Sequence, residues 1–169
     1  MALVTALDSG MVALLEHGAA CVRVARRDKR PIGTAWDKSA TNSPEEIAAW
    51  LDSGLNVGLL CGSGGLIDVE YDDNDGKQLL RELGLADIVT PTWSSSRGQH
   101  RLFRLVDAIP VKGWSKLGGL EVRFGGKPAQ SVLPPSIHPS GKAYKWIVSP
   151  ADVAPAEVTL ADLALEDLL

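Results

Sequence analysis

The feature that most constrains the fold is a series of short apolar segments with period-two spacing, most of them bounded by glycine or proline turns. Such segments are typical of β-strands. The pattern predicts strands over residues 20–25, 56–61, 65–71, 100–105, 119–124, 130–133 and 143–148. The glycine-rich turn at 62–65 predicts that the second and third strands form a hairpin. Because strands outnumber helices and turns join most of them, the pattern favours an α+β fold with a mostly antiparallel or mixed sheet.

Helices are predicted between and around these strands. The clearest begins with Ser43 as N-cap, a proline in the first helical position and Glu46 to close a capping box. The others cover residues 3–17, residues 75–83 and about ten residues that follow Thr159.

The size and composition indicate one globular domain. The chain has 169 residues, of which 45% are hydrophobic and 22% charged. Two cysteines and three histidines exclude a disulfide scaffold and predict no structural zinc site. No apolar run approaches the roughly 18 residues of a membrane span, and no signal peptide is recognisable at the N-terminus. We therefore expect a protein of the cytoplasm without membrane contact.

The charges are unevenly distributed. The formal net charge is −4, but residues 151–169 hold five acids and no base. The remaining 150 residues carry 17 bases and 16 acids, a balance of +1. Residues 68–75 contain five carboxylates, whereas residues 88–151 contain nine bases and two acids. An acidic cluster within basic surroundings suits a divalent metal beside a polyanion, although a salt-bridged surface would give the same pattern.

Two carboxylates stand on one predicted strand, in the order Asp68-Val69-Glu70. With period two, both project from the same face, about 7 Å apart along the strand. Acids this close repel each other unless a cation or proton lies between them. Mg²⁺ or Mn²⁺, held by carboxylates and by substrate phosphates, is the expected cation. The alternative is a strand edge that faces solvent.

Two further candidates lie on later strands. Alternation predicts that Glu121 and Arg123 share a face, so Glu121 can add a third carboxylate to the site. His100 follows the small-residue turn SSRGQ and is predicted to share a strand face with Arg104. An exposed strand face for Glu121 and a structural role for His100 remain open. The standard motifs of P-loop, dinucleotide-binding, serine hydrolase and EF-hand proteins do not occur.

Taken in order, these features resemble the prim-pol domain of the archaeo-eukaryotic primase superfamily, found in phage and plasmid replication proteins. Asp68-Val69-Glu70 matches its Asp-x-Asp/Glu motif, SSRGQH with His100 matches its Ser/Gly-rich turn, and Leu120-Glu121 matches its third acid. The stretches DKRPI, GLNVGLLCG and LPPSIHPSGKAYKW also match. The resemblance covers roughly residues 10–150, and it implies a catalytic domain over 1–150 followed by an acidic linker or docking helix over 151–169.

The resemblance implies an RRM-like, mostly antiparallel sheet that carries the metal site, plus a small N-terminal α/β unit. In this reading Asp68, Glu70 and Glu121 hold two Mg²⁺ or Mn²⁺ ions. His100 contacts the phosphates of the incoming nucleotide. Softer candidates for triphosphate or template contacts are Arg101, Arg104, Arg123, Lys29, Ser136 and His138.

The implied function is that of a DNA primase/polymerase, a nucleotidyltransferase. It would use a single-stranded DNA template and primer with dNTP or NTP. Primer synthesis would belong to the full-length context, with a helicase domain or subunit downstream, in the host cytoplasm if the protein is phage-encoded. Two other functions stay open: a metal-dependent nuclease or phosphodiesterase, and a non-catalytic domain that binds single-stranded DNA.

Overall fold

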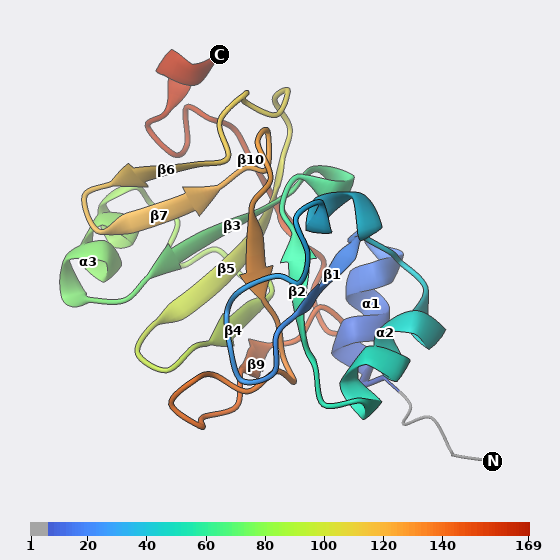
Figure 1. Cartoon of the computed structure of the whole chain (residues 1–169). Coiled ribbons are helices and arrows are strands. Elements are labelled where there is room, and N and C mark those ends of the chain that lie inside the picture. Colours follow the sequence, from blue (N-terminus) through green and yellow to red (C-terminus); the bar gives the residue numbers. More distant parts are fainter. Residues whose placement is uncertain (1–6) are drawn as a thin grey trace.

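Residues 7–169 are described in the computed structural model, in which two β-sheets pack side by side with helices on their outer faces (Figure 1). The start of the first predicted helix, residues 3–6, lies outside the described residues. Within the described range no helix has the length and apolar character needed to cross a bilayer.

The smaller sheet belongs to an N-terminal α/β unit. Its antiparallel strands have the order β1-β2-β8. The strands are β1 (Cys21–Val24), β2 (Asn56–Leu60) and β8 (Gln130–Val132), and the helices of this unit are α1 (Ser9–Glu16), α2 (Pro44–Asp52) and the short 3₁₀ helix η1 (Trp36–Ser39). Helix α2 begins as predicted, because the Ser43 hydroxyl accepts a hydrogen bond from the Glu46 amide at 3.3 Å. Met11 and Ile47 are fully buried in the core of this unit.

The larger sheet has the order β6-β7-β3-β5-β4-β9. Its strands are β6 (Trp114–Leu117), β7 (Leu120–Arg123), β3 (Leu66–Tyr71), β5 (Gln99–Leu105), β4 (Thr92–Ser94) and β9 (Lys145–Val148). These pairings are all antiparallel, and only β10 (Ala156–Val158) runs parallel to its partner β5. The fold is therefore α+β with mostly antiparallel sheets, as predicted.

The two faces of the larger sheet have different neighbours. Leu66 of β3, with Trp93 and Leu102, belongs to the core of the N-terminal unit. The alternate residues Ile67 and Val69 belong to a second core, which also contains residues of α3 (Asn74–Glu82) and of the C-terminal segment. Because Asp68 and Glu70 alternate with Ile67 and Val69, they lie on the face toward the N-terminal unit.

The predicted hairpin between the second and third strands is wrong. Strand β2 pairs with β1 and β8, whereas β3 pairs with β5 and β7 of the other sheet. The connection η2 (Ser63–Gly65) follows Gly62, and both Gly62 (φ 89°) and Gly64 (φ 61°) are left-handed. These positive φ angles turn the chain from one sheet to the other instead of back onto the same strand.

The C-terminal segment also differs from its prediction. Strand β10 pairs with β5, and the side chains of Leu160 and Leu163 are fully buried in the second core. The turn that Thr159 begins ends at Ala164, whose φ is 54°, and only the short 3₁₀ helix η3 (Glu166–Leu168) follows. Residues 156–165 thus contribute to the second core through Val158, Leu160, Leu163 and Leu165, and they form a strand and a turn where a helix was predicted.

Candidate functional site

Cross-strand pairing brings the predicted acids together. On β3, Asp68 lies opposite Arg123 of β7, and Glu70 lies opposite Glu121 of β7 on one side and His100 of β5 on the other. Directly opposed residues of an antiparallel pair project from the same face. The structure therefore places all five side chains on the sheet face that is turned toward the N-terminal unit.

Asp68 lies at the junction of the two sheets. Its side chain is fully buried, and its Oδ2 atom accepts hydrogen bonds from Arg123 Nη1 at 3.0 Å and from the Ser131 hydroxyl at 2.6 Å. Ser131 belongs to β8, so this bond connects the smaller sheet to the larger one. The second oxygen, Oδ1, is buried and has no hydrogen-bond partner within residues 7–169. Burying a carboxylate oxygen without a hydrogen-bond partner costs free energy, and a bound cation would offset this cost.

His100 lies between the two carboxylates of β3. Its Nδ1 atom is 2.7 Å from Asp68 Oδ2, and its Nε2 atom is 2.9 Å from Glu70 Oε2. The buried Trp93 ring stacks on the imidazole, with 4.8 Å between ring centroids and 4° between planes. Burial disfavours the charged ring, but the charges and hydrogen bonds of Asp68 and Glu70 outweigh this effect and raise the pKa of His100 to about 9. The protonated imidazole then donates to both carboxylates.

Arg123 pairs with all three acids. Its Nη2 atom lies 3.3 Å from Glu70 Oε1 and 3.1 Å from Glu121 Oε1, in addition to the bond to Asp68. Burial raises the pKa of Glu70, but His100 and Arg123 together lower it to about 2. Three carboxylates and two cations thus form one compact cluster, in which the ion pairs and hydrogen bonds fix the orientation of the acids.

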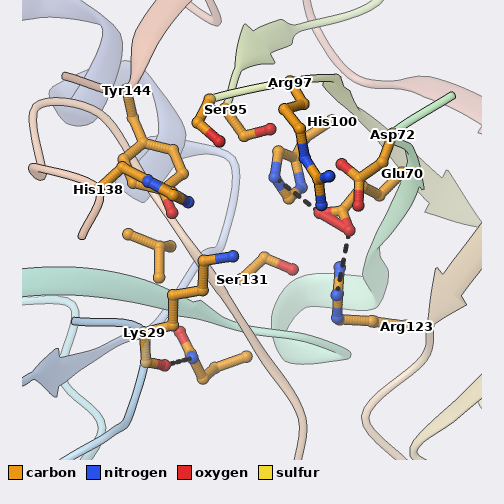
Figure 2. Close-up of a pocket in the computed structure, with 13 residues that line it drawn as sticks. Lys29, Glu70, Asp72, Ser95, Arg97, His100, Arg123, Ser131, His138 and Tyr144 are labelled. Atoms are coloured by element: carbon orange, nitrogen blue, oxygen red, sulfur yellow. Dashed lines mark hydrogen bonds and ion pairs between the residues drawn. The ribbon is translucent and has the colours of Figure 1, made fainter. Parts of the chain in front are cut away.

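The cluster forms part of a cavity of about 410 Å³. The residues that line it are Lys29, Glu70, Asp72, Ser95, Ser96, Arg97, His100, Arg123, Gln130, Ser131, Val132, His138 and Tyr144. Figure 2 shows Lys29, His138 and Tyr144 across the cavity from Glu70, His100 and Arg123.

The cations supplied by loops lack protein partners. Lys29 and Arg97 make no side-chain hydrogen bond or ion pair in the described part of the chain. The Ser140 amide donates to Nδ1 of His138 at 3.0 Å, so neutral His138 carries its proton on Nε2. Partial burial and the charges of Lys29 and Arg97 lower the pKa of His138. The loop side of the cavity is consequently suited to an anion.

The acidic cluster fits a divalent metal ion. One ligand atom from each of Asp68, Glu70 and His100 lies within 4.8 Å of the others, so the group could hold a metal. The unpartnered Asp68 Oδ1 and the carboxylate oxygens of Glu70 are hard donors that suit Mg²⁺ or Mn²⁺. Glu121 adjoins this group through Arg123 but is not one of its three members. His100, which the resemblance associates with phosphates, belongs to this three-residue group and also lines the cavity.

Three of the candidates for triphosphate or template contacts do not line the cavity. Arg101 projects from the opposite face to His100 and donates to the carbonyls of Leu85 and Ile88. Arg104 donates to the carbonyls of Gly64 and of His17, the latter at 2.9 Å, and so ties α1 to the larger sheet. Ser136 is buried, and its hydroxyl accepts from the Val57 amide at 2.9 Å. These contacts serve the fold, whereas Lys29, Arg123 and His138 do line the cavity.

Several residues of the site were not among the predicted ones. Ser131 and Gln130 come from β8, Asp72 follows β3, and Tyr144 precedes β9. Asp72 belongs to the acidic cluster of residues 68–75, and Gln130 and Ser131 are polar residues inside a predicted strand, so the sequence held a signal for these three. Trp93 was not among the predicted site residues, and its contact with His100 depends on the pairing of β4 with β5.

Clustered carboxylates on a sheet beside a basic cavity are consistent with a metal-dependent enzyme that acts on phosphate-bearing substrates. The family described as Prim-Pol, bifunctional DNA primase/polymerase, N-terminal, matches residues 11–159. The chain belongs to this family, which confirms the resemblance seen in the sequence. A comparison with curated proteins finds no match. Family membership supports a primase/polymerase type of function in general, with DNA and nucleotides as substrates.

Proposed function

We propose that the protein is a template-dependent nucleotidyltransferase, which transfers a nucleotide from dNTP or NTP to a 3′-hydroxyl in DNA replication. The observation that carries this proposal is the position of Asp68, Glu70 and Glu121 beside a cavity whose loop cations lack protein partners. Family membership supports the same reaction class. Primer synthesis would be the task of this site in the context of a replication protein with a helicase domain or subunit.

The acids would hold the metals of this reaction. Asp68, Glu70 and Glu121 are proposed as ligands of two divalent ions, either Mg²⁺ or Mn²⁺, and the unpartnered Asp68 Oδ1 is the observation that favours a cation there. When bound, such ions would lower the pKa of the 3′-hydroxyl and neutralise charge on the departing pyrophosphate. His100 and Arg123 would hold these carboxylates in place through the ion pairs that they make with them.

The loop side of the cavity would hold the triphosphate. Lys29 and Arg97 offer charges without protein partners, and His138 offers an Nε2 proton. The hydroxyls of Ser95 and Ser96 line the same cavity and can donate to phosphate oxygens. Binding the triphosphate there would orient its α-phosphate toward the carboxylates, so that the chain contributes mainly by positioning the reactants and stabilising negative charge.

The first test is extension of a labelled primer on a template, with dNTPs or NTPs and with Mg²⁺ or Mn²⁺. The wild type should extend the primer. The double variant Asp68→Ala/Glu70→Ala should lose at least about a thousandfold in rate, since the metal ligands are gone. The matched control is Asp152→Ala/Glu166→Ala, which removes two exposed carboxylates and should extend as the wild type does.

Other outcomes would contradict the proposal. Degradation of single strands without nucleotides, lost in Asp68→Ala/Glu70→Ala, would show a nuclease. Binding of single strands without any extension by the wild type would favour a non-catalytic domain. Thermal unfolding of each variant would show whether a loss of activity reflects the site or the fold.

A further inference from the structure

A second hollow adjoins the carboxylates on the side away from the loop cations. It has a volume of about 190 Å³. Glu70 and Asp72 line both this hollow and the larger cavity, whereas Lys116 and Glu121 line only this one. Glu70 and Asp72 therefore border two hollows, one lined by β5, β8 and the loops, and the other lined by β6 and β7.

Strand β6 carries an exposed tryptophan on the same sheet face as the acids. Trp114 lies directly opposite Arg123, and Lys116 lies directly opposite Glu121. Directly opposed residues share a face, so both side chains project on the side of Asp68 and Glu70. Trp114 is 52% exposed, and the other four tryptophans of the chain are buried or half-buried. An exposed indole on the edge strand next to a candidate active site contributes little to the core.

Three lysines lie on or next to the strand that carries Trp114. The Lys116 ammonium lies 5.8 Å from the centroid of the Trp114 ring. Lys112 and Lys127 are exposed and adjoin the start of β6, because the Gly126 amide donates to the Lys112 carbonyl at 2.9 Å and Gly113 packs against the backbone of Lys127. No acid occurs between residues 108 and 120. An aromatic ring with lysines beside it is the combination that binds single-stranded nucleic acid, through base stacking and phosphate contacts.

We propose that Trp114 and Lys116 form a platform for the nucleic-acid strand that is extended, with a base on the indole and a phosphate at the ammonium. This inference rests on the proposed function. In an in-line displacement the attacking and leaving oxygens lie on opposite sides of the reacting phosphorus. If the triphosphate enters from the loop cations, the 3′-hydroxyl must approach from the other side of the carboxylates, where β6 lies. Lysines on an edge strand also hinder pairing with a strand of another protein, which favours nucleic acid as the occupant.

The platform predicts a specific loss of strand binding. Fluorescence anisotropy of a labelled oligothymidylate, without metal and without nucleotide, measures the affinity at several salt concentrations. Trp114→Ala should bind at least about fivefold more weakly, because stacking on one aromatic ring is lost, and Trp114→Phe should retain most of the affinity. Lys116→Ala should reduce the salt dependence of log K by about 0.7, the value for one phosphate contact on a single strand.

Two matched controls separate this effect from a general change of surface. Ile147→Ala removes an apolar side chain that is also 52% exposed, on the edge strand at the other end of the sheet. Lys77→Ala removes an exposed lysine of α3, beside a different hollow. Both variants should bind the oligothymidylate as the wild type does. Equal affinities of Trp114→Ala and the wild type would overturn the platform.

Primer extension tests the proposed platform and the proposed polymerase activity separately. Trp114→Ala should raise the KM for primer–template while kcat at saturating DNA is largely retained, whereas Asp68→Ala/Glu70→Ala should bind the strand without extending it. Weaker strand binding by Trp114→Ala in a protein that never extends primers would support the platform and contradict the polymerase. Normal extension with an unchanged KM in Trp114→Ala would contradict the platform alone.

Discussion

The charged side chains in and beside the cavity fall into two groups, which differ in whether they are paired with other side chains of the protein. The sheet charges, Asp68, Glu70, His100, Glu121 and Arg123, are connected to one another by hydrogen bonds and ion pairs between 2.7 and 3.3 Å. The loop charges, Lys29 and Arg97, make no such contact within residues 7–169. Glu70, His100 and Arg123 of the first group line the same cavity as Lys29 and Arg97. The side chains of the first group are paired within the protein, whereas those of the second are available to a ligand.

This difference indicates separate tasks. The paired sheet charges are preorganised, so no side chain of that group has to be ordered when a substrate arrives. The unpaired loop charges repel one another and are stabilised only when an anion enters. In the proposed function, a divalent cation would bind the first group at the unpartnered Asp68 Oδ1, and a polyphosphate would bind the second. The predictions below test whether the two groups are as distinct as the contacts indicate.

The largest expected effect concerns the sheet cation. Arg123→Met leaves three neighbouring carboxylates without their shared partner, and it should lower the free energy of unfolding by about 3 kcal/mol in metal-free buffer. Arg97→Met, the matched loop variant, should change it by less than about 0.5 kcal/mol, because Arg97 is exposed and unpaired. Urea unfolding measures both. Equal losses of stability in the two variants would remove the distinction between the groups.

The reverse pattern should hold for nucleotide binding. Lys29→Ala and Arg97→Ala should each weaken the affinity for a nucleoside triphosphate by about tenfold, the effect of one charge-assisted contact. Their stability toward urea should stay that of the wild type. Isothermal titration calorimetry gives the affinities, and Lys145→Ala, an exposed lysine of β9 that does not line the cavity, is the control. Undiminished affinity in both loop variants would show that the triphosphate binds elsewhere.

The smallest effect is expected on the titration of His138. Partial burial and the charges of Lys29, Arg97 and Lys142 lower the pKa of His138, Asp72 raises it, and the net pKa lies below the usual value. Bound inorganic triphosphate favours the protonated ring, so it should raise this pKa, and the affinity for triphosphate should increase as the pH falls through it. Lys29→Ala should also raise the pKa in the free protein. NMR of the His138 ring measures both shifts, and a pKa unaffected by triphosphate would place the anion away from this histidine.

Local patterns in the sequence were enough to predict part of the site. Alternation placed Asp68 and Glu70 on one face of a strand, and it placed Glu121 with Arg123, because a side chain's direction depends only on its position along its own strand. The start of α2 was equally predictable, since an N-cap acts within a few residues. The family was recognisable for the same reason: its motifs are short and occur in a fixed order.

What the sequence by itself determined, then, is which side chains share a face and where several elements begin. Only the tertiary structure decided which strands became neighbours: β2 and β3 entered different sheets, Ser131 reached Asp68 from β8, and Arg101 and Arg104 took up structural contacts. It also exposed Trp114 and buried Trp93, two tryptophans that the sequence could not tell apart. The physical reason is that pairing between distant strands depends on how all the apolar faces are buried together, and no local pattern contains that information.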